Sequence, residues 1–262
     1  ITPAYAVKHA IDKLYPGEYQ VDVVDFAYEV SAHFTDRFLK SSWNGALTFP
    51  FLTKLVFNIL NLMYPVVSSK TLCRTIFWSW LKKGSRYIVG YNPDIVFSTH
   101  FLCSSIACWA KTNNKLDYKI ISFMTDPFGG HKLWADARID KILVSTVQAK
   151  YYLQNTGIRE EKIHIIPYPL KEEFFKNSIS EKSIKKNGKM TILVSYGGQG
   201  RGKIHKIVKS ICKADLDCNL IVVSGDNKKL ASKLEKFKNK LNSRVNLSIE
   251  GYVVNMHEFM KG

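Results

Sequence analysis

One short turn carries side chains that could do chemistry on a small polar substrate. Asp126, His131 and Trp134 lie between two apolar segments, Lys119–Met124 and Ile139–Val144, each of which predicts a strand. Open α/β sheets build their ligand sites just beyond the carboxyl ends of strands. Asp126 could act as a base or orient a sugar hydroxyl, His131 could hydrogen-bond a substrate or a diphosphate, and Trp134 could stack on a sugar ring. Each residue alone also fits an ordinary role, as a turn cap, a loop side chain or a core ring. Their clustering at one strand end favours a site.

A glycine-rich turn is the second candidate site. Gly197, Gly198, Gln199 and Gly200 follow the strand-like segment Met190–Ser195 and precede a helical segment. Small residues let the backbone approach a ligand, and a helix N-terminus offers N–H donors to phosphate. The turn has neither GxGxxG spacing nor the Lys-Ser/Thr of a P-loop, which argues against NAD binding and ATP hydrolysis. A phosphate site is expected, with a plain strand–helix turn as the alternative.

An aromatic helical segment, residues 49–64, is the third candidate. It contains Phe49, Phe51 and Lys54, and Pro50 and Pro65 mark the two ends of its helical part. It is too short and too polar to span a bilayer. An interfacial helix that receives a lipid acceptor and a core helix are equally consistent with its pattern. Basic residues before and after it would favour an anionic lipid surface.

The positions of these candidates depend on a pattern of alternating strands and helices. A helix is expected at residues 2–14, a strand at 21–26 and irregular helical structure at 28–91. From Ile95 to Ile166 strands and helices alternate, which predicts βαβ units and a mostly parallel sheet. Polar, lysine-rich residues then form a linker before a second α/β unit. The domains are expected at 1–170, with a linker at 171–189, and at 190–262.

Charge and cysteine content narrow the possible classes only slightly. The net charge of +16 would concentrate polyanions such as nucleic acid, anionic lipid headgroups or nucleotide diphosphates. No nucleic-acid partner is expected, because the chain has no RNP-like or helix-turn-helix motif. The five cysteines form no CxxC pair, which favours a reduced compartment without structural disulfides or zinc.

Both ends of the chain are expected to be incomplete. The helix that begins at Thr2 would normally follow a strand and a glycine-rich turn, and both would lie before Ile1. The second unit contains three predicted strands, about half of a doubly wound domain.

Taken together, these segments resemble a known family. The chain is similar to the diacylglycerol glycosyltransferases, namely monogalactosyldiacylglycerol synthases and processive diacylglycerol β-glucosyltransferases. The resemblance rests on the order and spacing of several short pieces: Pro93-Asp94-Ile95, Ser98-Thr99-His100, Thr125-Asp126…His131…Trp134, Glu161-Lys162-Ile163, Pro167 to Lys171, Gly197 to Gly200 and Gly251-Tyr252…Asn255-Met256.

The resemblance implies a GT-B fold, in which an N-terminal acceptor domain and a C-terminal nucleotide-sugar domain face a cleft. It implies transfer of a hexose from UDP-glucose or UDP-galactose to diacylglycerol by a peripheral enzyme on the cytoplasmic, anionic membrane surface. No cofactor or obligatory metal is implied. In this family a histidine serves as the base on the acceptor hydroxyl, and alignment places it just before Ile1. The chain alone is therefore expected to be inactive.

The resemblance also assigns individual residues. Gly197, Gly198, Gln199 and Gly200 would face the diphosphate, and the backbone of Tyr252 and Val253, with Met256 nearby, would bind uracil. Trp134, Phe49, Phe51 and Lys54 would lie on the acceptor and lipid side. Lys171 stands where the family usually has Arg, which keeps the charge but loses bidentate geometry.

Two other interpretations remain open. The same fold could serve a lipid-linked N-acetylglucosaminyltransferase of cell-wall synthesis. A non-enzymatic alternative is a basic module that binds nucleic acid or a lipid surface.

Overall fold

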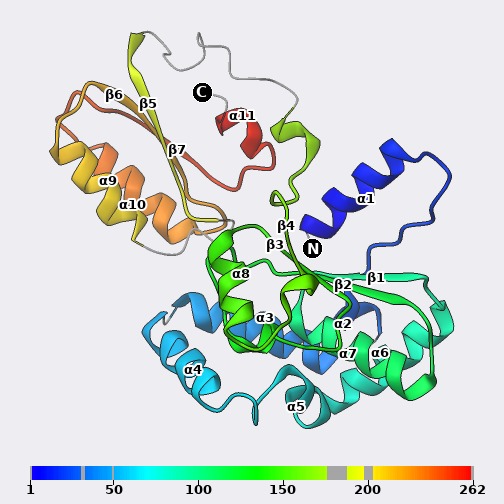
Figure 1. Cartoon of the computed structure of the whole chain (residues 1–262). Coiled ribbons are helices and arrows are strands. Elements are labelled where there is room, and N and C mark those ends of the chain that lie inside the picture. The colour runs from blue at the N-terminus through cyan, green and yellow to red at the C-terminus, as the bar shows by residue number, and fades with distance from the viewer. Residues whose placement is uncertain (1, 31–32, 49, 176–187, 198–202, 261–262) are drawn as a thin grey trace. The chain divides into compact units, whose positions relative to one another are not determined.

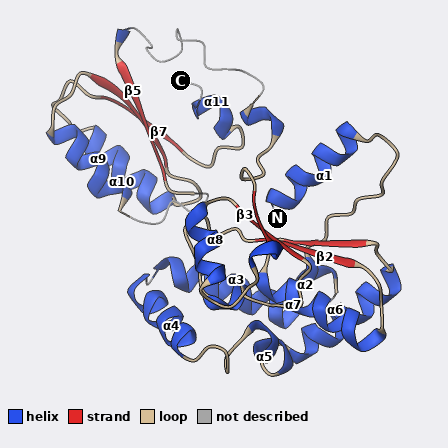
Figure 2. Ribbon diagram, viewed as in Figure 1, coloured by secondary structure: helices blue, strands red, loops and turns tan. Residues whose placement is uncertain are grey.

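The computed structural model describes residues 2–30, 33–48, 50–175, 188–197 and 203–260. The chain divides into two compact units, Ile1–Lys171 and Glu172–Gly262. Each unit combines helices with one parallel sheet (Figures 1 and 2). The predicted α/β class with parallel sheets is therefore confirmed.

The sheet of unit 1 contains four strands in the order in which they occur along the chain. These are β1 (Ile95–Ser98), β2 (Lys119–Phe123), β3 (Lys141–Val144) and β4 (Ile163–Ile165). All neighbouring pairs are parallel. The carboxyl ends of all four strands consequently lie along one edge of the sheet, as the sequence pattern predicted.

Helices and short 3-10 turns surround this sheet. They are α1 (Thr2–Leu14), α2 (Phe26–Glu29), α3 (His33–Thr48), α4 (Pro50–Leu62), α5 (Ser69–Arg74), α6 (Trp78–Tyr91), α7 (Phe101–Asn114), α8 (Val147–Gln154), η1 (Lys132–Trp134) and η2 (Glu160–Lys162). Two of them begin at side-chain caps beyond strand ends. His100 Nδ1 accepts from Leu102 N at 3.3 Å, and Thr146 Oγ1 accepts from Ala149 N at 3.1 Å. Such caps satisfy backbone donors that a helix start leaves free.

The core of unit 1 is rich in aromatic rings from the helices. The buried Trp80 of α6 contacts Phe77 edge-on at 6.2 Å between ring centroids and Phe26 at 6.0 Å. A Cβ at Gly84 would lie 2.8 Å from the Phe26 ring, so the close approach of α2 to α6 requires a glycine there.

Unit 2 repeats the architecture on a smaller scale. Its strands are β5 (Met190–Ser195), β6 (Cys218–Val223) and β7 (Asn246–Glu250), all parallel and in chain order. Its helices are α9 (Ile204–Lys213), α10 (Lys228–Lys238) and α11 (Met256–Met260), with a 3-10 turn η3 (Glu172–Phe174). Buried aliphatic residues of α9, β6, α10 and β7 form its core.

One predicted element is wrong. Residues 21–25 form no strand, and Phe26 begins helix α2. An apolar, β-branched segment becomes a strand only where a neighbouring strand takes up its backbone hydrogen bonds. In the described part of the chain, side chains contact this segment instead: Lys8 Nζ donates to Val21 O at 2.6 Å, and the Tyr91 hydroxyl donates to Asp22.

The cysteines lie in the cores rather than at a site. Cys73, Cys108, Cys212 and Cys218 are buried, and Cys103 is half-buried. Burial raises the pKa of the Cys73, Cys103 and Cys108 thiols to about 12, so these thiols are protonated at neutral pH. Across the described residues, no group of His, Cys, Asp and Glu side chains is arranged to hold a metal ion. None of the helices in the described part of the chain is both long and apolar enough for a membrane span.

Candidate functional site at the carboxyl edge of the first sheet

The turn that carries Asp126 is held against helix α8. The Thr146 hydroxyl, at the start of α8, donates to Pro127 O. Gly129 has φ +97°, and a Cβ there would lie 3.2 Å from the Tyr152 ring of the same helix. A Cβ at Gly130 would run into the Asp126 carboxylate. The two glycines are therefore required by close contacts on both sides of the turn.

Asp126 is oriented by a tryptophan. Trp134 Nε1 donates to Asp126 Oδ2 at 2.7 Å, and Trp134 is only 3% exposed. A hydrogen bond to an ionised acceptor is stronger than one between neutral groups. Asp126 itself remains half-buried, whereas the Trp134 side chain is enclosed. The structure places the Trp134 ring in the core, and its contact with a sugar or a lipid stays a prediction.

His131 is enclosed by aromatic rings. It is 7% exposed, stacks parallel to Phe57 of α4 at 4.8 Å and meets Phe101 of α7 edge-on at 4.6 Å. Burial lowers the pKa of His131 to about 4, although the negative charge of Asp126 acts in the opposite direction. The imidazole is therefore neutral at pH 7, and its Nδ1 has no hydrogen-bond partner among the described residues.

Two further polar groups lie at the same edge. His100, directly beyond β1, stacks on Phe101 at 4.5 Å, and burial lowers the pKa of His100 to about 4, with His131 adding to the shift. Ser145, directly beyond β3, has a buried Oγ that lacks a partner within the described chain. Buried polar atoms without partners are uncommon and suit a site that a ligand completes. Position after a strand was the sequence signal for both residues, and reasoning from sequence assigned neither to the site.

Helix α4 packs on this site through the face that carries Asn61 and Phe57. Asn61 Oδ1 accepts from Lys132 N at 2.8 Å, and Phe57, one turn earlier on the same face, stacks on His131. The Lys132 ammonium lies 5.7 Å from the Tyr64 ring centroid. The turn that carries His131 and the aromatic segment predicted to meet lipid are therefore in direct contact.

The opposite side of α4 is apolar and exposed. Six apolar residues of α4 and Met63, which follows it, are 46% to 85% exposed: Phe51, Leu52, Leu55, Val56, Ile59, Leu62 and Met63. Soluble proteins seldom leave such a contiguous apolar surface without a partner. Of the residues predicted to meet lipid, Phe51 and Lys54 are exposed, and Phe49 lies outside the described residues.

The predicted donor-binding residues lie mainly in unit 2. Gly197 has φ +66° and follows β5, while Tyr252 and Val253 follow β7. Since the strands are parallel, these positions share the carboxyl edge of the second sheet. Met256 begins α11, and Lys171 is an exposed residue at the end of unit 1. Gly198, Gln199 and Gly200 lie outside the described residues, so their phosphate role stays a prediction.

The architecture defines the class of protein. Two successive α/β units with parallel sheets are typical of the GT-B glycosyltransferase fold, which confirms the expected fold class. The crystal structure of Anabaena HepE in complex with UDP is similar with a TM-score of 0.50 and 10% identity, and covers 70% of this chain and 54% of that chain. At this identity the likeness shows the fold alone.

Sequence comparison identifies the family. The family model described as monogalactosyldiacylglycerol (MGDG) synthase matches residues 2–169, and the chain belongs to this family. A spinach (Spinacia oleracea) chloroplastic monogalactosyldiacylglycerol synthase is 23% identical over 98% of this chain and 50% of its own length. A processive diacylglycerol beta-glucosyltransferase of Bacillus licheniformis is 29% identical over 59% of this chain and 40% of its own length. The chain thus spans about half the length of the spinach synthase.

Proposed function

We propose that this protein transfers a hexose from UDP-glucose or UDP-galactose to diacylglycerol at a membrane surface. The bond between the anomeric carbon and the diphosphate would break, and the acceptor oxygen would bond to that carbon. UDP would leave, and the hydroxyl proton of diacylglycerol would pass to a base. Family membership supports this reaction class. The names of the two relatives share the diacylglycerol acceptor and differ in the hexose.

The exposed apolar face of α4 is the observation that carries the acceptor proposal. Diacylglycerol stays in the bilayer, so an enzyme that uses it must bind at the lipid–water interface. The outward face of α4 offers the apolar surface of an interfacial helix, and its inward face holds the His131 turn. The net charge of +16 would add attraction to an anionic leaflet.

The site residues take different roles in this proposal. Asp126, oriented by Trp134 and half-exposed, would accept a hydrogen bond from a hydroxyl of the hexose or the acceptor. His131, neutral and buried, would hydrogen-bond a substrate group through its free Nδ1. In unit 2, the turn at Gly197 and the backbone at Tyr252 and Val253 would bind the diphosphate and the uracil.

Vesicle binding tests the acceptor side. Leu55 and Ile59 are 47% and 48% exposed on α4, so the variant Leu55→Gln/Ile59→Gln should weaken binding of the 262-residue chain to anionic vesicles by about tenfold or more. The matched control is Ile207→Gln/Leu216→Gln in unit 2, where both side chains are 42% exposed. Equal binding of the α4 variant and the control variant to the vesicles would refute the proposed lipid role of α4.

Glycolipid synthesis tests the reaction. The 262-residue chain and the complete native reading frame that encodes it would each receive UDP-glucose or UDP-galactose with diacylglycerol in anionic vesicles. Hexosyl-diacylglycerol from either protein would support the proposal, and Asp126→Asn should lower its formation. Absence of product from both proteins with both donors would refute the diacylglycerol reaction.

A further inference from the structure

The turn after β2 presents one aromatic ring to the solvent. Phe128 is 76% exposed, whereas Trp134, farther along the same segment, is 3% exposed. Phe128 lies two residues after Asp126, at the carboxyl edge of the first sheet. Of the two rings, that of Phe128 is the one that a ligand beside Asp126 can reach from solvent.

Backbone contacts hold Phe128 in a fixed position. Pro127 restricts the chain before it, and the Pro127 carbonyl accepts from the Thr146 hydroxyl at the start of α8. Gly129 after it has φ +97° and lies against the Tyr152 ring, where an added Cβ would come within 3.2 Å. A side chain on a turn that is fixed in this way loses less conformational entropy on binding than one on a mobile loop.

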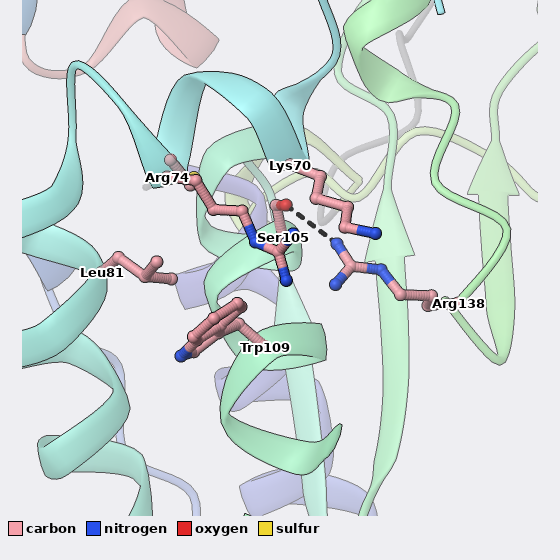
Figure 3. A pocket seen from close by; sticks show the side chains of 7 residues that line it. Lys70, Arg74, Leu81, Ser105, Trp109 and Arg138 are labelled. Atoms are coloured by element: carbon pink, nitrogen blue, oxygen red, sulfur yellow. Dashed lines mark hydrogen bonds between the residues drawn. The ribbon is translucent and has the colours of Figure 1, made fainter. Parts of the chain in front are cut away.

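Other partly exposed rings of unit 1 are covered by cations. Where α5 and α7 meet, the Arg74 guanidinium lies over Trp109, 4.5 Å from its ring centroid (Figure 3). The Lys82 ammonium lies 4.8 Å from the ring centroid of Trp78. Among the described residues, no cation and no second ring lies in such contact with Phe128, so its ring remains accessible.

We propose that Phe128 is a stacking surface for a hexose ring and thereby selects sugar ligands at this site. The C–H groups of a hexose carry partial positive charge and the face of an aromatic ring is negative, so the two attract each other. Asp126 supplies a hydrogen-bond acceptor beside the ring: the Cα atoms of the two residues are at most about 7 Å apart, and Trp134 Nε1 orients the carboxylate.

The class of ligand rests on the hexose transfer proposed above. A hexose ring reaches this edge of the sheet either as part of a UDP-hexose or as the headgroup of a glycolipid. Both sources offer the same C–H face and hydroxyls, and binding measurements separate them.

Three variants of Phe128 and one control test the stacking role. Phe128→Ala removes the ring, Phe128→Leu keeps an apolar side chain without a ring, and Phe128→Trp keeps an aromatic face. The matched control is Phe34→Ala on α3, where the ring is 78% exposed. All are made in the complete native reading frame that encodes this chain.

Two assays isolate the contribution of the hexose. Co-sedimentation compares phosphatidylcholine vesicles that contain glucosyl- or galactosyl-diacylglycerol with vesicles that contain diacylglycerol. Calorimetry compares UDP-glucose or UDP-galactose with UDP. In each assay the ratio of the two affinities reports the preference for the hexose and cancels whatever the rest of the ligand contributes.

Phe128→Ala and Phe128→Leu should lower this ratio by about fivefold, and Phe128→Trp and Phe34→Ala should keep it. Loss in the vesicle assay alone would assign the ring to a glycolipid, and loss in the nucleotide assay alone would assign it to the donor. A wild-type ratio of one in both assays, an unchanged ratio in Phe128→Ala, or a wild-type ratio in Phe128→Leu would overturn the proposal.

These measurements need no turnover, so failure of this proposal and failure of the proposed function are distinguishable. A hexose preference that depends on Phe128, in a protein that makes no glycolipid, would refute the transferase and keep the stacking role. Glycolipid synthesis by a protein whose Phe128→Ala variant keeps the full preference would do the reverse. Because Phe128 is exposed, its variants should unfold at the wild-type midpoint, which checks that unit 1 remains folded.

Discussion

The bond between Trp134 and Asp126 offers the sharpest test of how the candidate site is built. Trp134→Phe removes the indole N–H that donates to Asp126 Oδ2 at 2.7 Å and leaves the ring site filled by a smaller apolar group. Asp126→Ala removes the acceptor. Because each variant breaks the same bond, the two effects should not add.

The magnitude follows from burial and charge. A hydrogen bond to an ionised group contributes about 1.5–3 kcal/mol, and the half-buried state of Asp126 points to the lower end. The smaller ring of Phe loses about a further 1–1.5 kcal/mol of apolar burial at a position that is 3% exposed. We therefore expect Trp134→Phe to lower the free energy of unfolding of unit 1 by about 3 kcal/mol and the double variant to show a coupling of about 1.5 kcal/mol.

The distribution of tryptophan makes the assay selective. All five tryptophans lie within residues 1–171, so urea unfolding followed by tryptophan fluorescence reports unit 1 and not unit 2. With a slope of about 2 kcal/mol per molar urea, the midpoint of Trp134→Phe should fall by about 1.5 M. If the effects of the single variants add to within about 0.4 kcal/mol, the bond does not orient Asp126 and the reasoning fails.

Three further outcomes can be measured in the same unfolding assay. His131 has a pKa of about 4 in the folded state and 6.5 in the unfolded state, so the unfolded state takes up the proton first and stability is lost as pH falls through this window. From pH 7 to pH 5, the free energy of unfolding of the wild type should fall by about 2 kcal/mol more than that of His131→Phe. Equal losses in the two proteins would contradict the burial of a neutral imidazole. Gly130→Ala should destabilise unit 1 by about 2 kcal/mol, because the new Cβ would displace the Asp126 carboxylate. The control Gly90→Ala on α6, which has open space around it, should be neutral or stabilising. Similar effects of the two variants would show that the turn tolerates a side chain. Phe57→Gln should destabilise unit 1 by about 2 kcal/mol, because Phe57 stacks on His131. Leu55→Gln on the exposed face should change the free energy of unfolding by less than about 0.5 kcal/mol. A larger loss for Leu55→Gln than for Phe57→Gln would show that the other face of α4 packs inward.

Local pattern determined most of the elements. Apolar runs such as Lys119–Met124 and the alternation with helices predicted both parallel sheets, because buried parallel strands need apolar residues on both faces. The local pattern gave the wrong prediction at residues 21–26, where a similarly apolar, β-branched segment forms no strand. Pairing depends on a neighbouring strand, and composition does not contain that information.

For the candidate site too, the sequence predicted one part and the packing decided the other. Its location could be predicted for Asp126 and His131, because strand ends of a parallel sheet meet at one edge. His100 also follows a strand, but the sequence assigned it no role in the site. The sequence by itself thus determined the fold class, the family resemblance and the edge of the sheet where polar residues gather.

Only the tertiary structure decided which way the side chains face. Helix α4 is apolar around most of its circumference, so its pattern could not separate a core helix from an interfacial one. Contacts made across 71 residues of chain, from Asn61 to Lys132, turn its Asn61 face inward and leave its apolar face exposed. The same packing buries Trp134 against Asp126 and encloses His131, since the environment of a side chain depends on neighbours that are distant in the sequence.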